Sequence, residues 1–239
     1  MILLWVTVGL AAGFLVNYLA DVLPATRTLS RPEWWPPTLR SLRRFLGTPR
    51  VALIFLALGV AGGLLWQFPP QDFPVVWLAV VLAYFTLVTV VDIEHRVVMH
   101  PVSIAGGLLL GAIGLARHGL TDTLLGGAAG FVFMLALYFA GDWMGRVLAK
   151  MRKEKWADTA LGFGDVNLAG VIGLLMGWPG VIVALFLGML LAALYSGGLI
   201  LLSVARGRYS AFSTIPYAPF LCLGAVLLVL AGVYNLLGR

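Results

Sequence analysis

The chain has 239 residues, of which 61% are hydrophobic and only 11% are charged, and its formal net charge is +6. A soluble domain carries about 25% charged residues. This composition, with a mean hydropathy of +1.00, therefore excludes an ordinary water-soluble enzyme and indicates an integral membrane protein. The single cysteine, Cys222, excludes an internal disulfide and a cysteine-rich metal site.

Eight apolar stretches follow one another along the chain, and most are about as long as a helix needs to cross a bilayer. The first has no basic leader and no small-residue cleavage site, so we expect a retained helix rather than a signal peptide. Glycines recur inside the stretches, where they let helices approach closely. The expected fold is all-α, a polytopic membrane protein that forms a single transmembrane domain over residues 1–239. Its eight transmembrane helices are expected at 2–23, 51–68, 75–91, 102–116, 124–145, 163–178, 181–203 and 216–236.

Basic residues are concentrated on one side of these expected helices. Eight crossings place alternate loops on opposite sides, and fourteen of the sixteen lysines and arginines fall in the loops of one side, namely 24–50, 92–101, 146–162 and 204–215. Lysine and arginine are retained on the cytoplasmic side, so we expect these loops in the cytosol and both termini outside. The positive charge thus follows the topology, which indicates the lipid bilayer and not nucleic acid as its partner.

Two aspartates stand out because they lie at cytoplasmic ends of expected helices. Asp92 follows the third apolar stretch, and Asp165 closes the run Gly-Phe-Gly-Asp at the start of the sixth. A carboxylate at a membrane boundary is costly to keep. Two of them at one depth can share a proton and supply the acid and the base of peptide hydrolysis, while Gly162 and Gly164 leave the backbone bare for an extended substrate. Either aspartate alone is equally well explained as a helix-end carboxylate.

Four stretches carry a more specific pattern. They are residues 13–24 (GFLVNYLADVLP), 92–101 (DIEHRVVMHP), 162–168 (GFGDVNL) and 215–221 (IPYAPFL). In composition and order they resemble the type IV prepilin peptidase family, membrane aspartyl proteases of the GxGD class. Asp92 and Asp165 match the two catalytic aspartates of that family, and His95 also matches a family position.

The resemblance implies a function and a setting. Such enzymes remove the short basic leader of prepilin or pseudopilin precursors at the cytoplasmic face of a prokaryotic inner membrane, and so serve type IV pilus or type II secretion assembly. Many members also methylate the new N-terminus with S-adenosylmethionine. No cofactor is expected for proteolysis.

The chain departs from the family pattern in several places. Many members bind zinc through two CxxC pairs after their first helix, but residues 25–50 contain no cysteine. We therefore expect a basic cytoplasmic loop without that motif, and no metal. Because the zinc loop accompanies the methylating forms, N-methylation stays open. Asn167 replaces a lysine, His100 replaces an aspartate, and Val22 replaces an arginine of the family pattern.

Five further polar residues have competing interpretations. Asn17 lies inside the first expected helix and either binds substrate backbone or bonds a neighbouring helix, the commoner role. Glu94 is expected in a solvated loop, where it is also a candidate for recognising the basic leader, and His95 is a candidate for tuning Asp92. Asp21 and Asp142 are expected to pair with loop arginines or lysines.

Two alternatives from other functional classes remain open. A small proton-coupled transporter could use the aspartates as a relay, although transporters more often hold carboxylates near the midplane and show an inverted repeat. An inactive scaffold of pilus or secretion assembly is the second alternative, and the intact pair Asp92 and Asp165 argues against it.

Overall fold

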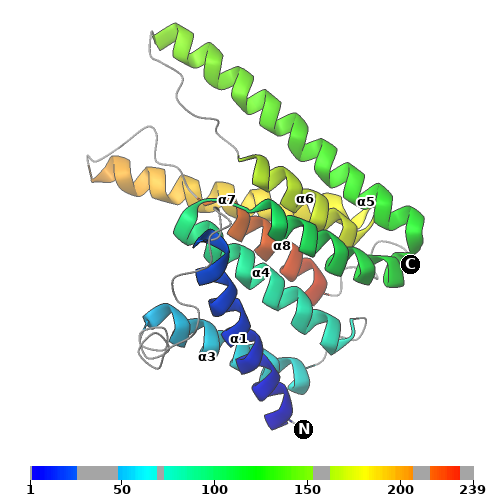
Figure 1. Ribbon diagram of the computed structural model, residues 1–239. Helices are drawn as coiled ribbons and strands as arrows, with labels where there is room; N and C mark the ends of the chain where they lie inside the picture. Colours follow the sequence, from blue (N-terminus) through cyan, green and yellow to red (C-terminus); the bar gives the residue numbers. More distant parts are fainter. Residues whose placement is uncertain (1, 26–47, 69–72, 153–161, 207–215, 232–239) are drawn as a thin grey trace. The chain divides into compact units, whose positions relative to one another are not determined.

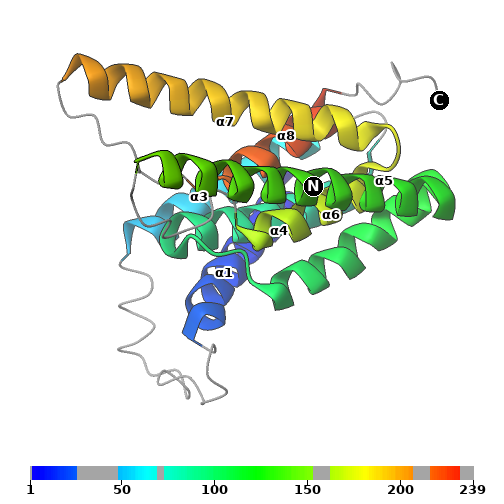
Figure 2. The same ribbon diagram turned by 90° about the horizontal axis from the view of Figure 1, so that it is seen from above.

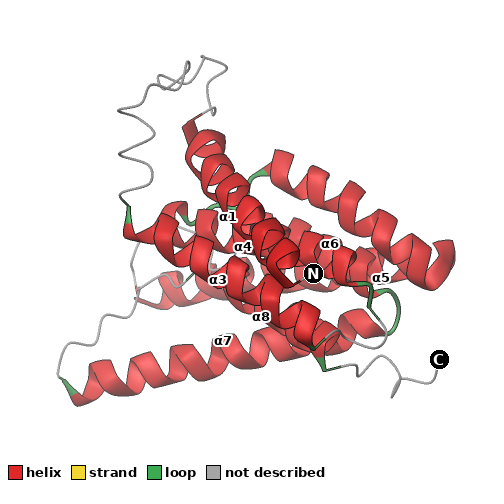
Figure 3. Ribbon diagram, turned by 90° about the horizontal axis from the view of Figure 1, so that it is seen from below, coloured by secondary structure: helices red, strands yellow, loops and turns green. Residues whose placement is uncertain are grey.

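The computed structural model describes residues 2–25, 48–68, 73–152, 162–206 and 216–231. Within these ranges every regular element is an α-helix and no strand is present (Figure 3), which confirms the all-α prediction. The contacts divide the chain into two compact units, Met1–His95 and Arg96–Arg239, and each is described by itself. The single domain over 1–239 stays a prediction, and most of the loop 25–50 lies outside the described residues.

The first unit consists of α1 (Ile2–Ala25), α3 (Pro49–Gln67) and α4 (Val75–His95) (Figure 1). α1 packs along α3, and both helices contact α4. The rings of Trp5, at the start of α1, and Trp66, at the end of α3, stack with centroids 6.3 Å apart. This contact shows that the two helices run antiparallel.

The second unit consists of α5 (His100–Arg152), α6 (Phe163–Met176), α7 (Gly180–Ala205) and α8 (Ala218–Leu230). α5 comprises two helical segments that fold back on each other at Gly119, where φ is 77° and ψ is 175°. α6 packs against α5, and α7 packs against α8 (Figure 2). α6 also contacts α7 and α8, and most of its residues are buried, so it lies in the interior of this unit.

Glycine allows the close packing of α5 against α6. A Cβ atom on either Gly126 or Gly173 would collide with the carbonyl oxygen of the other. The two backbones approach so closely that no side chain fits between them, as small residues permit in membrane helices. The prediction that glycines let the helices approach closely is thus confirmed for Gly126 and Gly173.

Five helices, α1, α3, α4, α5 and α7, are long and apolar enough to cross a membrane by length and composition, whereas α6 and α8 are apolar but shorter. Each of the eight predicted stretches falls on a helix, because two of them occupy the two segments of α5. The polytopic membrane class is thus supported. The number of eight transmembrane helices is not confirmed by helix length and stays a prediction.

α4 ends later than the sequence predicts. The predicted helix stops at residue 91 and is followed by a loop, but the helix continues to His95. Asp92 therefore lies inside α4, and Glu94 is helical rather than part of a solvated loop, which corrects the prediction for Glu94. The physical reason is Arg50 of α3, which binds Glu94 and offsets the cost of a carboxylate at a helix C-terminus.

Candidate active site

Asp165 is held in the first turn of α6. Gly162 is the N-cap residue, and its N–H donates to Asp165 Oδ2 at 3.3 Å, while the Asp165 N–H donates to the Gly162 carbonyl oxygen at 3.1 Å. The carboxylate lies at the positive end of the helix dipole, and the residue is only 8% exposed. Asp165 thus has the helix-end role that the sequence allowed, in a buried position that also suits acid–base chemistry.

Gly164 lies directly against the segment that precedes α5. A Cβ atom on Gly164 would be 2.7 Å from both the Cβ and the carbonyl oxygen of Val98, so only glycine fits there. Gly162 differs, because a Cβ at this position would meet nothing closer than Asp165 Oδ2 at 3.4 Å. The two glycines of the motif therefore have different steric environments. Their exposure to substrate stays a prediction.

Tyr217 is a residue of this site that sequence reasoning missed. It precedes the first residue of α8. Its partly buried phenol lies within electrostatic reach of Asp165. A phenol is protonated near neutral pH and can donate a hydrogen bond. The available signal was the tyrosine inside the motif 215–221, where the family pattern has phenylalanine.

Asp92 lies in the other unit. It sits three residues before the end of α4 and is 5% exposed. The structure thus buries both predicted catalytic carboxylates, each near the end of a helix. Their pairing in one catalytic site stays a prediction, because Asp92 belongs to the first unit and Asp165 to the second.

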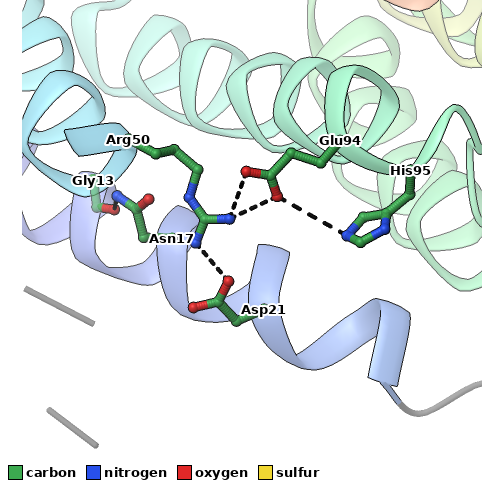
Figure 4. Close-up of polar contacts among 6 residues, drawn as sticks. All are labelled: Gly13, Asn17, Asp21, Arg50, Glu94 and His95. Carbon is green, nitrogen blue, oxygen red and sulfur yellow. Dashed lines mark hydrogen bonds and ion pairs between the residues drawn. The ribbon is translucent and has the colours of Figure 1, made fainter. Parts of the chain in front are cut away.

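Arg50 joins three helices of the first unit (Figure 4). Its Nη1 donates to both carboxylate oxygens of Glu94 on α4, at 2.8 and 2.6 Å, and its Nη2 donates to Asp21 Oδ1 on α1 at 2.5 Å. Among the described residues of this unit, Arg50 is the one lysine or arginine. The expected pairing of Asp21 with an arginine is confirmed, as is that of Asp142, which binds Arg146 in the second unit at 2.5 Å.

Asn17 and His95 lie close to this cluster (Figure 4). The buried Asn17 donates through Nδ2 to the Gly13 carbonyl oxygen of its own helix at 2.8 Å, rather than to a neighbouring helix as predicted. The reason is that a carbonyl four residues earlier is within reach of an amide side chain. His95 Nε2 lies 3.9 Å from Glu94 Oε2. The roles of Asn17, Glu94 and His95 in catalysis stay predictions.

An open groove of about 680 Å³ lies in the second unit between α6 and both segments of α5. We call it the α5–α6 groove. Its lining is apolar except for His100, Ser103 and Asn167. Asn167 Nδ2 and His100 Nδ1 are 3.1 Å apart and hydrogen-bonded, and the Ser103 hydroxyl donates to the Met99 carbonyl oxygen at 3.3 Å.

Comparison with known families shows which family the chain belongs to. Residues 78–197, half of the chain and a region that contains both Asp92 and Asp165, match the model of the type IV leader peptidase family. The chain belongs to this family. The resemblance drawn from the four motifs is thereby confirmed at the level of the family.

Curated relatives in this family share the name prepilin leader peptidase/N-methyltransferase. The protein of Pectobacterium carotovorum subsp. carotovorum is 29% identical over 194 residues, which cover 79% of this chain and 62% of that protein. The protein of Aeromonas salmonicida (strain A449) is 28% identical over a match that covers 65% of this chain and 50% of that protein. The protein of Bacillus subtilis (strain 168) is 27% identical over a match that covers 77% of this chain and 66% of that protein. The chain thus spans about one half to two thirds of these relatives. No solved structure matches it significantly.

Proposed function

We propose that this chain is a membrane-embedded aspartyl endopeptidase that removes the leader peptide of prepilin or pseudopilin precursors. The observation that carries the proposal is the contact of Gly164 with Val98, because it holds the Asp165 turn against the chain segment that follows Asp92. Membership of the type IV leader peptidase family supports the same reading. No feature of the described residues favours the transporter or the scaffold.

The covalent chain supports a shared site for the two aspartates. Val98 follows Asp92 by six residues, and six residues span at most about 20 Å even when fully extended. The Val98 backbone in turn touches the residue next to Asp165. A short stretch of chain thus joins Asp92 to the segment against which the Asp165 turn is packed.

The proposed mechanism needs one proton shared between Asp92 and Asp165. The ionised carboxylate takes a proton from a water molecule, whose oxygen attacks the carbonyl carbon of the scissile peptide bond. The protonated carboxyl group gives its proton to the leaving nitrogen, and the carbon–nitrogen bond breaks. At the end the pair again holds one proton. We propose that Tyr217, which lies within electrostatic reach of Asp165, donates a hydrogen bond to the Asp165 carboxylate and supports its ionised form.

The proposed setting is a prokaryotic inner membrane crossed several times, with the aspartates on the cytosolic side and both termini outside. The five long apolar helices support a multi-pass protein, and the concentration of basic residues in alternate loops supports the orientation. The proposed partners are the precursor itself and the pilus or type II secretion assembly machinery.

Methylation of the new N-terminus is the second activity named for the relatives, and S-adenosylmethionine would be its methyl donor. Nucleoside cofactors are often held by an acidic side chain on the ribose hydroxyls. The α5–α6 groove has no aspartate or glutamate in its lining, so it does not fit this cofactor.

The test is cleavage of a purified precursor in liposomes, followed by mass spectrometry. Wild-type protein should release the leader, and Asp165→Asn should leave the precursor intact. A mass gain of one methyl group in the presence of S-adenosylmethionine would add the second activity. An intact precursor after incubation with folded wild-type protein, for prepilin and pseudopilin alike, would contradict the proposal.

A further inference from the structure

Two acidic residues lie in the last turn of α4. Asp92 is buried, whereas the side chain of Glu94 is 32% exposed. The C-terminal end of a helix carries a partial negative charge, and its last four carbonyl groups have no partner within the helix. Within this turn only His95 can offset the two carboxylates, and only when it is protonated. The turn that carries Asp92 therefore depends on contacts from outside α4.

The residue that follows α4 has a strained backbone. Arg96 comes directly after His95 and has a φ of 52°, in the left-handed region that residues other than glycine avoid. Glycine usually makes a helix end of this kind. Other residues keep the conformation only where the surrounding structure holds them in it. Tertiary contacts, rather than the local sequence, thus determine where α4 ends.

Arg50 of α3 supplies such a contact. Its Nη1 donates to both carboxylate oxygens of Glu94, at 2.8 and 2.6 Å. The same guanidinium binds Asp21 of α1 through Nη2. The positive charge of Arg50 offsets the negative end of the α4 dipole. The contact with both oxygens also restricts the movement of Glu94 and of the helical turn to which it belongs.

Asn17 is placed to hold Arg50 in turn. Its side chain is fully buried, and its Nδ2 donates to the Gly13 carbonyl oxygen. Among the described residues, Asn17 Oδ1 and Arg50 Nε are buried atoms without a hydrogen-bond partner. One is an acceptor and the other a donor, and the Asn17 amide points toward the arginine side chain (Figure 4). Because an unpaired buried polar atom is costly, pairing of these two atoms, directly or through one water molecule, favours this position of Arg50.

We propose that Arg50 is a positioning residue for Asp92, and that Asn17 supports Arg50 through its Nε. By holding Glu94, Arg50 keeps the last turn of α4 helical, and the backbone of that turn sets the direction of the Asp92 side chain. Asp92 and Glu94 are two residues apart and point to nearly opposite sides of the helix, so Arg50 acts through the helix backbone. The proposal rests on the proposed peptidase function.

Asp21 and Glu94 provide a matched kinetic test, because both bind Arg50 but only Glu94 lies on the helix that carries Asp92. Glu94→Gln and Arg50→Gln should each lower kcat for a purified precursor at least about fivefold and change KM less than about twofold, because a displaced catalytic group weakens binding of the transition state alone. Asp21→Asn leaves the contacts of Glu94 in place and should change kcat and KM less than about twofold.

The double variant of Arg50→Gln and Glu94→Gln should be no slower than the slower single variant, because the two residues act through one contact. Thermal unfolding in detergent sets a temperature at which all these proteins are folded. If Arg50→Gln does not fold, the comparison of Glu94→Gln with Asp21→Asn decides the question alone.

Amide hydrogen exchange in liposomes gives a second readout, which needs no activity. The peptide that covers the last turn of α4, residues 92–95, should exchange at least about fivefold faster in Arg50→Gln and Glu94→Gln than in wild type, because local opening of a helix end exposes its amides. Asn17→Leu should accelerate the same peptide to a smaller extent. The first half of α4 should be unchanged in every variant, and Asp21→Asn should resemble wild type.

The outcomes separate this inference from the peptidase proposal. Equal loss of kcat in Asp21→Asn and Glu94→Gln, or faster exchange along the whole of α4, would show a general structural role and overturn the inference. A raised KM with unchanged kcat in Glu94→Gln would also overturn it, because Glu94 would then contact the substrate. Faster exchange confined to the last turn, without cleavage by wild type, would support the hold on that turn and count against the peptidase instead.

Discussion

Gly164 is packed so tightly against Val98 that a single added methyl group at Gly164 would collide with the Val98 Cβ and carbonyl oxygen, each 2.7 Å away. The turn that carries Asp165 is thereby fixed to the segment between α4 and α5. Gly162, two residues earlier, has room for a side chain and an extended backbone with φ of −77° and ψ of 143°, which any residue adopts. The GxGD motif of this chain is thus sterically asymmetric.

This asymmetry predicts different effects of the same substitution at the two glycines. Gly164→Ala should destabilise the protein by about 1–3 kcal/mol, as overpacking commonly does, and should reduce cleavage at least about tenfold because Asp165 is displaced. Gly162→Ala should keep most of the activity and stability. Thermal unfolding and cleavage rates of both variants test this, and equal losses at the two positions would contradict it.

Arg50 provides a second prediction. Arg50→Gln removes three hydrogen bonds and leaves Asp21 and Glu94 without their common partner, so it should cost about 1–3 kcal/mol of unfolding free energy. Arg50→Lys should be intermediate, because an ammonium group cannot hold both carboxylates in the same geometry.

The control for Arg50 is Arg146→Gln. Arg146 binds a single carboxylate, that of Asp142, and its side chain is 71% exposed. Exposed ion pairs contribute only about 0–1 kcal/mol to the free energy of unfolding. Denaturant or thermal unfolding of the three variants should therefore give a clear loss at Arg50 and a small one at Arg146. A larger loss of stability in Arg146→Gln than in Arg50→Gln would show that the contacts of Arg50 with Asp21 and Glu94 do not stabilise the protein.

Inhibitors provide a further prediction. Metal chelators and thiol reagents should leave cleavage unchanged within about twofold, because the loop 25–50 has no cysteine and Cys222 is buried in α8. Strong inhibition by a chelator would point to a metal site built from other ligands, and strong inhibition by a thiol reagent would place Cys222 near the reaction.

The helices could be predicted from the sequence because apolar runs and turn residues are local signals. Gly119 illustrates this, since the sequence predicts a break between the helices at 102–116 and 124–145 and the structure gives Gly119 a positive φ. The end of α4 could not be predicted in this way. It depends on Arg50, which lies 44 residues before Glu94 in the sequence.

The candidate site shows the same limit. Asp92 and Asp165 were found from their positions at the ends of apolar stretches and from the family pattern. The contact of Val98 with Gly164 and the proximity of Tyr217 to Asp165 depend on tertiary packing, which no local pattern encodes. The α5–α6 groove likewise arises only when the two segments of α5 fold back around α6.

The central claim is that Asp92 and Asp165 act as one acid–base pair, and a double-mutant comparison tests it most directly. Precursor cleavage is measured for wild type, Asp92→Asn, Asp165→Asn and the double variant. Each single substitution should reduce kcat/KM by at least about 10³-fold, within the range for loss of an acid or a base, and the double variant should be no worse than either, because residues that act as a unit are not additive. Substantial cleavage by either single variant, or multiplicative losses in the double variant, would contradict the account.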